Sequence, residues 1–211
     1  MDIYRTPLLT ARDAARHLEM PESTLDHWIR TQAADAPLVH AVAPERRGWP
    51  RMPFIAIVES YVLRALRDQG FSLAEIQSAA EMVRREFDDP FALASRRIAS
   101  DGVSLFVRLA SQDYVQARTG QVAIREVLQE HLEFIEWDTD GAPSFLRLRQ
   151  YRTARVVIDP RFGWGAPVLQ DRKTPVHAIV SLWRAGESIA TVAEEYELPE
   201  PVVEDVLRQA A

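Results

Sequence analysis

The residues best suited to recognising another molecule occur early in the chain, in PESTLDHWIR at positions 21–30. A helix expected from about Ser23 to Arg30 turns one polar group of side chains outward: Ser23, Thr24, His27 and Arg30. Their hydroxyl, imidazole and guanidinium groups can donate hydrogen bonds to phosphates or to base edges. Asp26 is acidic, unlike these donors, although it can pair with Arg30 four residues later or accept a hydrogen bond from cytosine. The alternative interpretation is a helical hairpin with a solvated polar face.

A second group of cations follows in PERRGWPR, residues 44–51, where Arg46, Arg47 and Arg51 bracket a glycine. Such a turn resembles the wing of a winged helix, which lays arginines along the DNA backbone or minor groove. The order of helix, turn, helix and arginine-bearing loop favours DNA binding over the solvated hairpin.

Several helices must position these residues. Thr10 is a suitable N-cap for a helix that ends at Met20-Pro21, just before the helix of Ser23 to Arg30. Residues 33–53 are rich in proline and predict a loop or short hairpin. A helix is expected over Phe54 to Arg67, with Gly70 after its end, and the capping box SLAE at 72–75 predicts another that ends before Asp89-Pro90.

The far end of the chain contains a second segment of the same pattern. ARHLEMPESTLDHWI from Ala15 and AEEYELPEPVVEDVL from Ala193 align without a gap, which predicts two trihelical helix-turn-helix units. The outward positions of the first unit are matched in the second by Pro201, Val202, Asp205 and Arg208. Because an acidic face opposes phosphate, we expect a partner-binding protein surface there instead, formed by Glu200, Glu204, Asp205 and Trp183. The alternative is self-association through Leu182, Trp183 and Val206.

The middle of the chain predicts strands as well as helices. VSLFV (103–107), FLRLR (145–149) and RVVID (155–159) are typical of strands, and residues 122–135 of an amphipathic helix. Beyond them we expect a helix over Pro175 to Arg184 and a helix capped by Ser188. The expected fold is mainly α with a small α+β middle part, and the expected domains are residues 1–88, 89–154 and 155–211.

Composition narrows the function further. The net charge is −6, cysteine is absent, and neither a signal segment nor a long apolar run occurs, which predicts a cytoplasmic protein with no membrane partner. RFGWGAP at 161–167 lacks the Lys-Ser/Thr of a phosphate-binding loop and predicts a tight turn. The five histidines are scattered. We therefore expect no enzyme, no catalytic residues, no metal site and no cofactor.

Residues 7–87 resemble the MerR-like winged helix-turn-helix, including FIAIVESYVLRALRDQGFSLAEI. Regulators of that family usually continue into a long dimerising coiled coil, whereas Asp89-Pro90 and the α+β segment follow here. The metal-sensing members of the family need cysteines, which this chain lacks.

The segment from Val156 to Leu207 resembles a domain of uncharacterised function (DUF 433) that is common in bacterial antitoxins. The residues that carry the resemblance are Asp159, Pro160, Gly165, Pro167, Arg172, Pro175, Gly186 and Ser188. Together the two ends resemble a VapB-type antitoxin. That resemblance implies a PIN-domain ribonuclease toxin as partner and repression of the shared operon through duplex operator DNA, which we expect a homodimer to bind. Two alternatives stay open: a stand-alone MerR-like regulator whose middle domain senses a ligand, and a structural adaptor.

Overall fold

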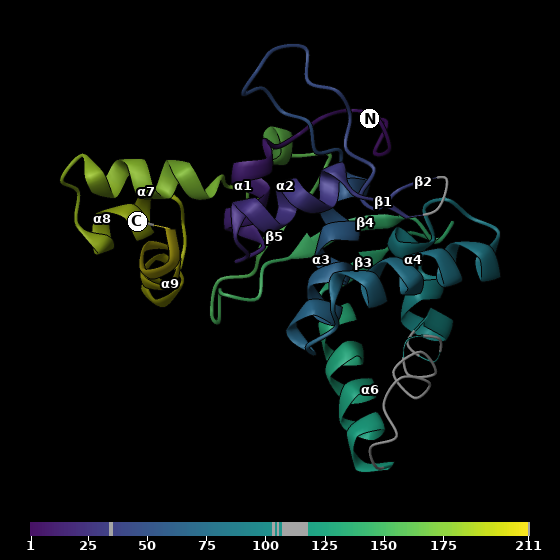
Figure 1. The fold of residues 1–211 in the computed structure, drawn as a ribbon. Coiled ribbons are helices and arrows are strands. Elements are labelled where there is room, and N and C mark those ends of the chain that lie inside the picture. The colour runs from purple at the N-terminus through teal and green to yellow at the C-terminus, as the bar shows by residue number, and fades with distance from the viewer. Residues whose placement is uncertain (34–35, 103, 105, 107–117, 211) are drawn as a thin grey trace. The chain divides into compact units, whose positions relative to one another are not determined.

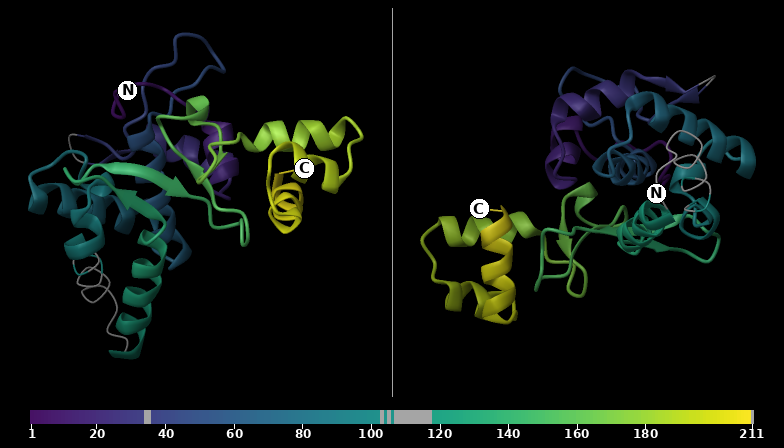
Figure 2. Two further views of the ribbon diagram at one scale, coloured as in Figure 1. Left: turned by 180° about the vertical axis from the view of Figure 1, so that it is seen from behind. Right: turned by 60° about the horizontal axis from the view of Figure 1, so that its bottom comes forward.

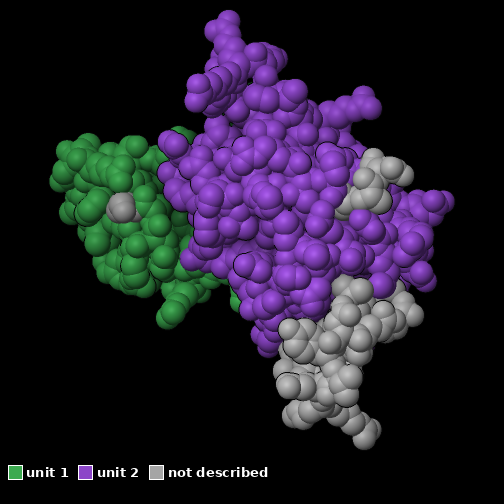
Figure 3. Space-filling view, viewed as in Figure 1, with its two compact units in different colours: residues 1, 145–211 green, residues 2–144 purple. Residues whose placement is uncertain are grey.

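The computed structural model describes residues 1–33, 36–102, 104, 106 and 118–210 (Figure 1). The chain divides into two compact units (Figure 3), here called the N-terminal unit (residues 2–144) and the C-terminal unit (residues 145–211, with which Met1 groups). Residues 89–144 thus share a compact unit with residues 2–88. The expected division into three domains, residues 1–88, 89–154 and 155–211, stays a prediction.

The N-terminal unit begins with the helix pair that the sequence predicts. Helix α1 spans Ala11–His17 and α2 spans Glu22–Arg30. The Thr10 side chain accepts a hydrogen bond from the backbone N–H of Asp13 at 3.1 Å, a cap that contributes about 1 kcal/mol. The buried face of α2 consists of Leu25, Trp28 and Ile29. The two helices pack against each other, so the polar face of α2 is turned away from α1.

A small hairpin and a long loop follow α2. Strands β1 (Gln32–Ala33) and β2 (Ala36–Pro37) are antiparallel. The loop after β2 returns to the start of the chain, where Leu9 and Met52 form an isolated bridge and the backbone N–H of Arg51 donates to the carbonyl of Leu9 at 2.9 Å. The expected loop or hairpin at 33–53 is confirmed for the described residues.

Two long helices form the core of this unit. Helix α3 (Phe54–Asp68) is buried over most of its circumference, and α4 (Leu73–Phe87) packs beside it. Both halves of the expected capping box are present, since Ser72 accepts from the N–H of Glu75 and Glu75 accepts from the N–H of Ser72. Gly70 has φ +89, a left-handed conformation that lets the chain turn between the helices.

The rest of the N-terminal unit follows α4 in the chain. It comprises the 3-10 turn η1 (Ala92–Ala94), the π-helical η2 (Ile98–Gly102), helix α6 (Arg118–Leu132) and strand β3 (Ile135–Trp137). Both η1 and α6 contact α3, and His131 in α6 stacks on Tyr61 with ring centroids 3.9 Å apart. The expected strand at 103–107 lies largely outside the described residues, and the two described positions, Ser104 and Phe106, are helical.

The C-terminal unit combines a small sheet with three helices. Strand β4 (Pro143–Arg147) pairs antiparallel with β5 (Val156–Ile158), and β5 pairs with β6 (Val168–Leu169). The turn η3 (Gly163–Gly165) lies between β5 and β6. The strands expected at 145–149 and 155–159 are confirmed.

Helices α7 (Val176–Arg184), α8 (Ile189–Glu195) and α9 (Glu200–Ala210) pack against one another, as the views in Figure 2 also show. Ser188 caps α8 by accepting from the N–H of Thr191 at 3.0 Å. Their shared core is apolar and includes Ile179, Val192, Val203 and Val206. The mainly helical fold with a small β part agrees with the prediction.

Candidate nucleic-acid interface

The outward face of α2 carries the donors that the sequence predicts. Ser23, His27 and Arg30 are exposed, and Thr24 is half-buried. Asp26 is half-buried and forms no ion pair with Arg30 in the structure, which describes both residues. Arg30 is therefore not engaged by the neighbour that could have neutralised it.

A shallow pocket of about 370 Å³ opens beside this face. Ser23, Thr24 and His27 line one side of it, and Arg67 and Ser72 line the other from the junction of α3 and α4. Hydroxyl, imidazole and guanidinium donors thus converge here without an acidic side chain among the lining residues. An anionic backbone is the ligand that such a set of donors suits.

The loop between β2 and α3 projects beyond the helices of its unit (Figure 1). At its tip Gly48 has φ +85, and the N–H of Trp49 donates to the carbonyl of Arg46 at 3.1 Å. The Arg46 guanidinium lies 5.2 Å from the centroid of the Trp49 ring, and Arg47 is exposed. The tip therefore presents two arginines to solvent.

Arg51 lies at the base of the loop rather than at the tip. It is half-buried, its carbonyl accepts from the N–H of Val42 at 2.9 Å, and its Nε is buried without a hydrogen-bond partner. Of the three arginines predicted from PERRGWPR, Arg46 and Arg47 are thus the more accessible pair.

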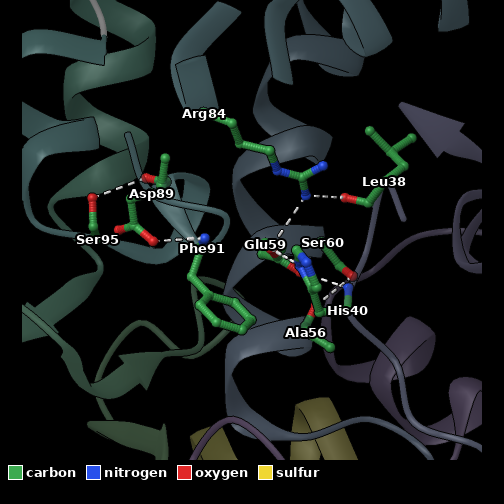
Figure 4. A network of polar contacts seen from close by, with 10 residues as sticks. Leu38, His40, Ala56, Glu59, Ser60, Arg84, Asp89, Phe91 and Ser95 are labelled. Carbon is green, nitrogen blue, oxygen red and sulfur yellow. Dashed lines mark hydrogen bonds and ion pairs between the residues drawn. The ribbon is translucent and has the colours of Figure 1, made fainter. Parts of the chain in front are cut away.

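A buried ionic network ties the start of this loop to the core helices (Figure 4). Glu59 in α3 is fully buried, and its carboxylate accepts from the backbone N–H of His40 at 2.8 Å while its Oε1 lies 2.7 Å from His40 Nδ1. Arg84 in α4 lies 3.5 Å from Glu59 and donates to the carbonyl of Leu38 at 3.1 Å. The network therefore fixes residues 38–40, from which the loop departs.

Burial lowers the pKa of Arg84, and the neighbouring Glu59 carboxylate opposes that effect. Two further guanidinium nitrogens of Arg84, Nε and Nη1, are buried without a hydrogen-bond partner. Glu59 is therefore the charge that balances this cation. Neither Glu59 nor Arg84 belongs to a motif predicted from the sequence; the available signal was an acid inside the apolar run FIAIVESYVL.

The turn of the first helix pair is also held from α3. Glu19 has φ +49, the N–H of Met20 donates to the carbonyl of Ala15 at 3.0 Å, and Arg64 donates to the carbonyl of Leu18. Arg64 also lies 3.8 Å from the Glu19 carboxylate. These contacts set the angle at which α2 leaves α1.

The C-terminal unit reproduces this turn residue by residue. Glu197 has φ +50, and the N–H of Leu198 donates to the carbonyl of Ala193 at 2.8 Å. Thr10 and Ser188 occupy matching positions, and each caps its helix in the same way. The two helix-turn-helix segments predicted from the sequence therefore share their local geometry, and their difference lies in the side chains.

The outward face of α9 is acidic, but fewer of the predicted residues lie on it than expected. Glu200 and Glu204 are exposed, and Trp183 in α7 is 39% exposed. The prediction that Asp205 faces outward is wrong: it is 1% exposed and accepts from the backbone N–H groups of Thr153 at 2.7 Å and Ala154 at 2.9 Å. Asp205 thus joins α9 to the loop before β5.

Val206 is also buried, so it cannot belong to the self-association surface considered from the sequence. Leu182 is half-buried in α7.

Among the described residues, no group of three or more His, Asp or Glu side chains is placed to hold a metal ion. None of the helices in the described part of the chain is long and apolar enough to cross a membrane.

The fold and this surface define a protein with an N-terminal DNA-binding domain of the helix-turn-helix class. Residues 7–80 match the family described as "Putative DNA-binding HTH domain", and residues 156–210 match "Protein of unknown function (DUF433)". The second match covers the residues on which the sequence resemblance rested, from Asp159 to Ser188.

The whole chain is similar to "Putative antitoxin VapB45" of Mycobacterium tuberculosis, with 30% identity over 97% of this chain and 94% of the relative. It is also similar to the crystal structure of Rv2018 from Mycobacterium tuberculosis, with 29% identity, a TM-score of 0.81, and coverage of 95% of this chain and 97% of the other. The chain belongs to the VapB-type antitoxin family that the first of these relatives represents.

Proposed function

We propose that this chain is the antitoxin of a type II toxin–antitoxin system, which binds duplex operator DNA as a homodimer and represses its own operon. The observation that carries the DNA-binding part is the combination of exposed donors on α2 with Arg46 and Arg47 on the adjacent loop. Phosphate contacts from such cations position a protein on DNA, and donors on a recognition helix read base edges. A dimer places two such helices on paired half-sites.

The proposed partner of the C-terminal unit is a PIN-domain ribonuclease toxin, which the antitoxin neutralises without catalysis of its own and without a metal or other cofactor. The family of the chain supports a toxin partner. The exposed acids Glu200 and Glu204 offer charge that repels DNA and suits the basic surface with which a ribonuclease holds phosphates. Trp183, exposed on α7 of the same unit, adds an aromatic side chain.

Reversing the acidic face is expected to weaken toxin binding. In Glu200→Arg with Glu204→Arg, affinity for the toxin encoded beside this chain should fall at least about tenfold, mainly through slower association. The matched control is Glu126→Arg with Glu130→Arg, which changes the same charge at the same spacing on exposed positions of α6. Surface plasmon resonance measures both; equal toxin affinity in the two double variants and the wild type rules out this docking surface.

One observation favours a second candidate function, a stand-alone regulator that senses a ligand. A pocket of about 490 Å³ lies within residues 96–141 and is lined by Arg96, Arg97, Ser100, Trp137 and Asp140, among others. A volume of this size is sufficient for a small organic ligand. The antitoxin proposal needs no ligand, so the two differ in whether operator affinity changes when a small molecule occupies this pocket.

A further inference from the structure

The pocket of about 490 Å³ in the N-terminal unit lies between two segments that are distant in sequence. One is residues 96–100, which run into the π-helical η2, and the other is residues 137–141, the end of β3 and the turn after it. The backbone N–H of Arg96 donates to the carbonyl of Gly141 at 2.9 Å and joins the two. A π-helical turn is rare and occurs frequently at functional sites.

The turn that forms one side of this pocket is held by its own hydrogen bonds. The N–H of Gly141 donates to the carbonyl of Asp138 at 3.0 Å, and the N–H of Asp138 donates to the carbonyl of Ala142 at 2.8 Å. Gly141 has φ +85, a conformation that residues with a side chain rarely adopt. The Asp140 carboxylate accepts from the N–H of Ala142 at 3.0 Å. This side of the pocket is therefore formed before any ligand binds.

Two arginines line the other side. The Arg97 guanidinium lies 4.0 Å from the centroid of the Phe87 ring and donates to the Phe87 carbonyl at 3.0 Å. These contacts hold the guanidinium in place and use one of its five N–H groups, so others remain to donate. The Arg96 side chain is exposed and forms no ion pair within the described part of the chain.

The charges of the pocket favour an anion. Asp140 is the acid among the described lining residues, and within the described part of the chain it forms no salt bridge with either arginine. Two cations against one anion leave one positive charge in excess. Guanidinium groups suit carboxylates and phosphates, because their planar fork donates two parallel hydrogen bonds to two oxygens. The hydroxyl groups of Ser100 and Thr139 add further donors.

An aromatic side chain completes the lining. Trp137 is half-buried and forms no aromatic pair with another described residue. Its indole therefore offers a ring face on which a flat ring can stack. The volume of the pocket lies in the range of sites for small organic ligands.

We propose that this pocket binds a small aromatic anion, a flat ring that carries a carboxylate or a phosphate group. The ring stacks on Trp137, and the anionic group accepts hydrogen bonds from Arg96 and Arg97. This inference rests on the second candidate function for its consequence, since it names the class of ligand that such a regulator senses. Binding itself needs neither operator DNA nor a toxin.

Equilibrium dialysis of the full chain against naphthyl phosphate and naphthoate tests the site. The two probes share a ring and differ in the anionic group, so the tighter of them identifies that group. At least one should bind saturably with a dissociation constant below about 1 mM, as a ligand of this size allows. Inorganic phosphate, which has no ring, and naphthalenemethanol, which has no charge, should each bind at least about tenfold more weakly.

Arg96→Ala should weaken binding of the tighter probe at least about tenfold, because it removes a charged hydrogen bond. The matched control, Arg85→Ala, removes an exposed arginine of α4 that does not line the pocket and should leave the affinity unchanged. Trp137→Leu should bind the probe no better than inorganic phosphate. Circular dichroism checks the folding of each variant, and Arg96→Ala should fold because its side chain is exposed.

Two results overturn the site: a wild-type chain that binds neither aromatic anion saturably, or an equal loss of affinity in Arg85→Ala and Arg96→Ala. The second candidate function fails separately. If a saturating aromatic anion binds and leaves operator affinity unchanged, the binding site stands and the ligand-sensing regulator is excluded.

Discussion

Replacing Glu59 with alanine is expected to lower the free energy of unfolding by about 3–5 kcal/mol, the cost of removing one partner from a buried ion pair. The substitution leaves the Arg84 guanidinium buried without its balancing charge and the His40 N–H without its acceptor. Because residues 38–40 lead into the arginine-bearing loop, the variant should also exchange the amide protons of that loop faster. Urea unfolding monitored by tryptophan fluorescence measures the first effect.

Two variants separate the ionic contribution from a general effect of substitution. Glu86→Ala on the exposed side of α4 should change stability by no more than about 0.5 kcal/mol. Combining Glu59→Leu with Arg84→Met removes both charges, and it should be more stable than Glu59→Leu alone because no unpaired cation remains. A loss for Glu59→Ala no greater than that for Glu86→Ala would falsify the role given to this network.

Removing both arginines at the tip of the loop should weaken operator binding at least about tenfold. In Arg46→Ala with Arg47→Ala, the slope of log K against log salt should fall by about 2 per protomer, since each lost phosphate contact contributes about 0.9. The loss should be similar for operator and unrelated duplexes, because phosphate contacts carry little sequence information. Fluorescence anisotropy at several salt concentrations measures both quantities.

The matched control is Arg152→Ala with Arg184→Ala, which removes the same charge from exposed positions of the C-terminal unit. Its salt slope should equal that of the wild type. Thr24→Ala and His27→Ala on α2 should instead reduce the preference for operator over unrelated DNA. If the two double variants lose affinity equally, net charge rather than the loop determines binding.

Features set by neighbouring residues could be predicted from the sequence. The caps at Thr10, Ser72 and Ser188 each depend on a backbone N–H three residues away, so their residue types alone indicate them. The turn that the two helix pairs share could likewise be predicted, because the segments that begin at Ala15 and Ala193 align without a gap.

Features set by distant parts of the chain could not be predicted in this way. The sequence predicts Asp205 as an exposed acid on α9. In the structure it accepts hydrogen bonds from backbone groups of Thr153 and Ala154, which are remote in sequence. The Glu59 network likewise joins three segments that only the fold brings together. The run VSLFV has strand propensity, yet Ser104 and Phe106 are helical, because intrinsic preference for β structure yields to context.

The central claim is that the α1–α2 segment contacts DNA whereas the α8–α9 segment does not. Amide hydrogen exchange of the full chain with and without operator duplex tests it most directly. Because α1–α2 and α8–α9 share one turn geometry, each segment is the internal control for the other. We predict protection over residues 22–30 and 45–49 on adding DNA and none over residues 200–208. Protection over α9 with no change over α2 would contradict the account.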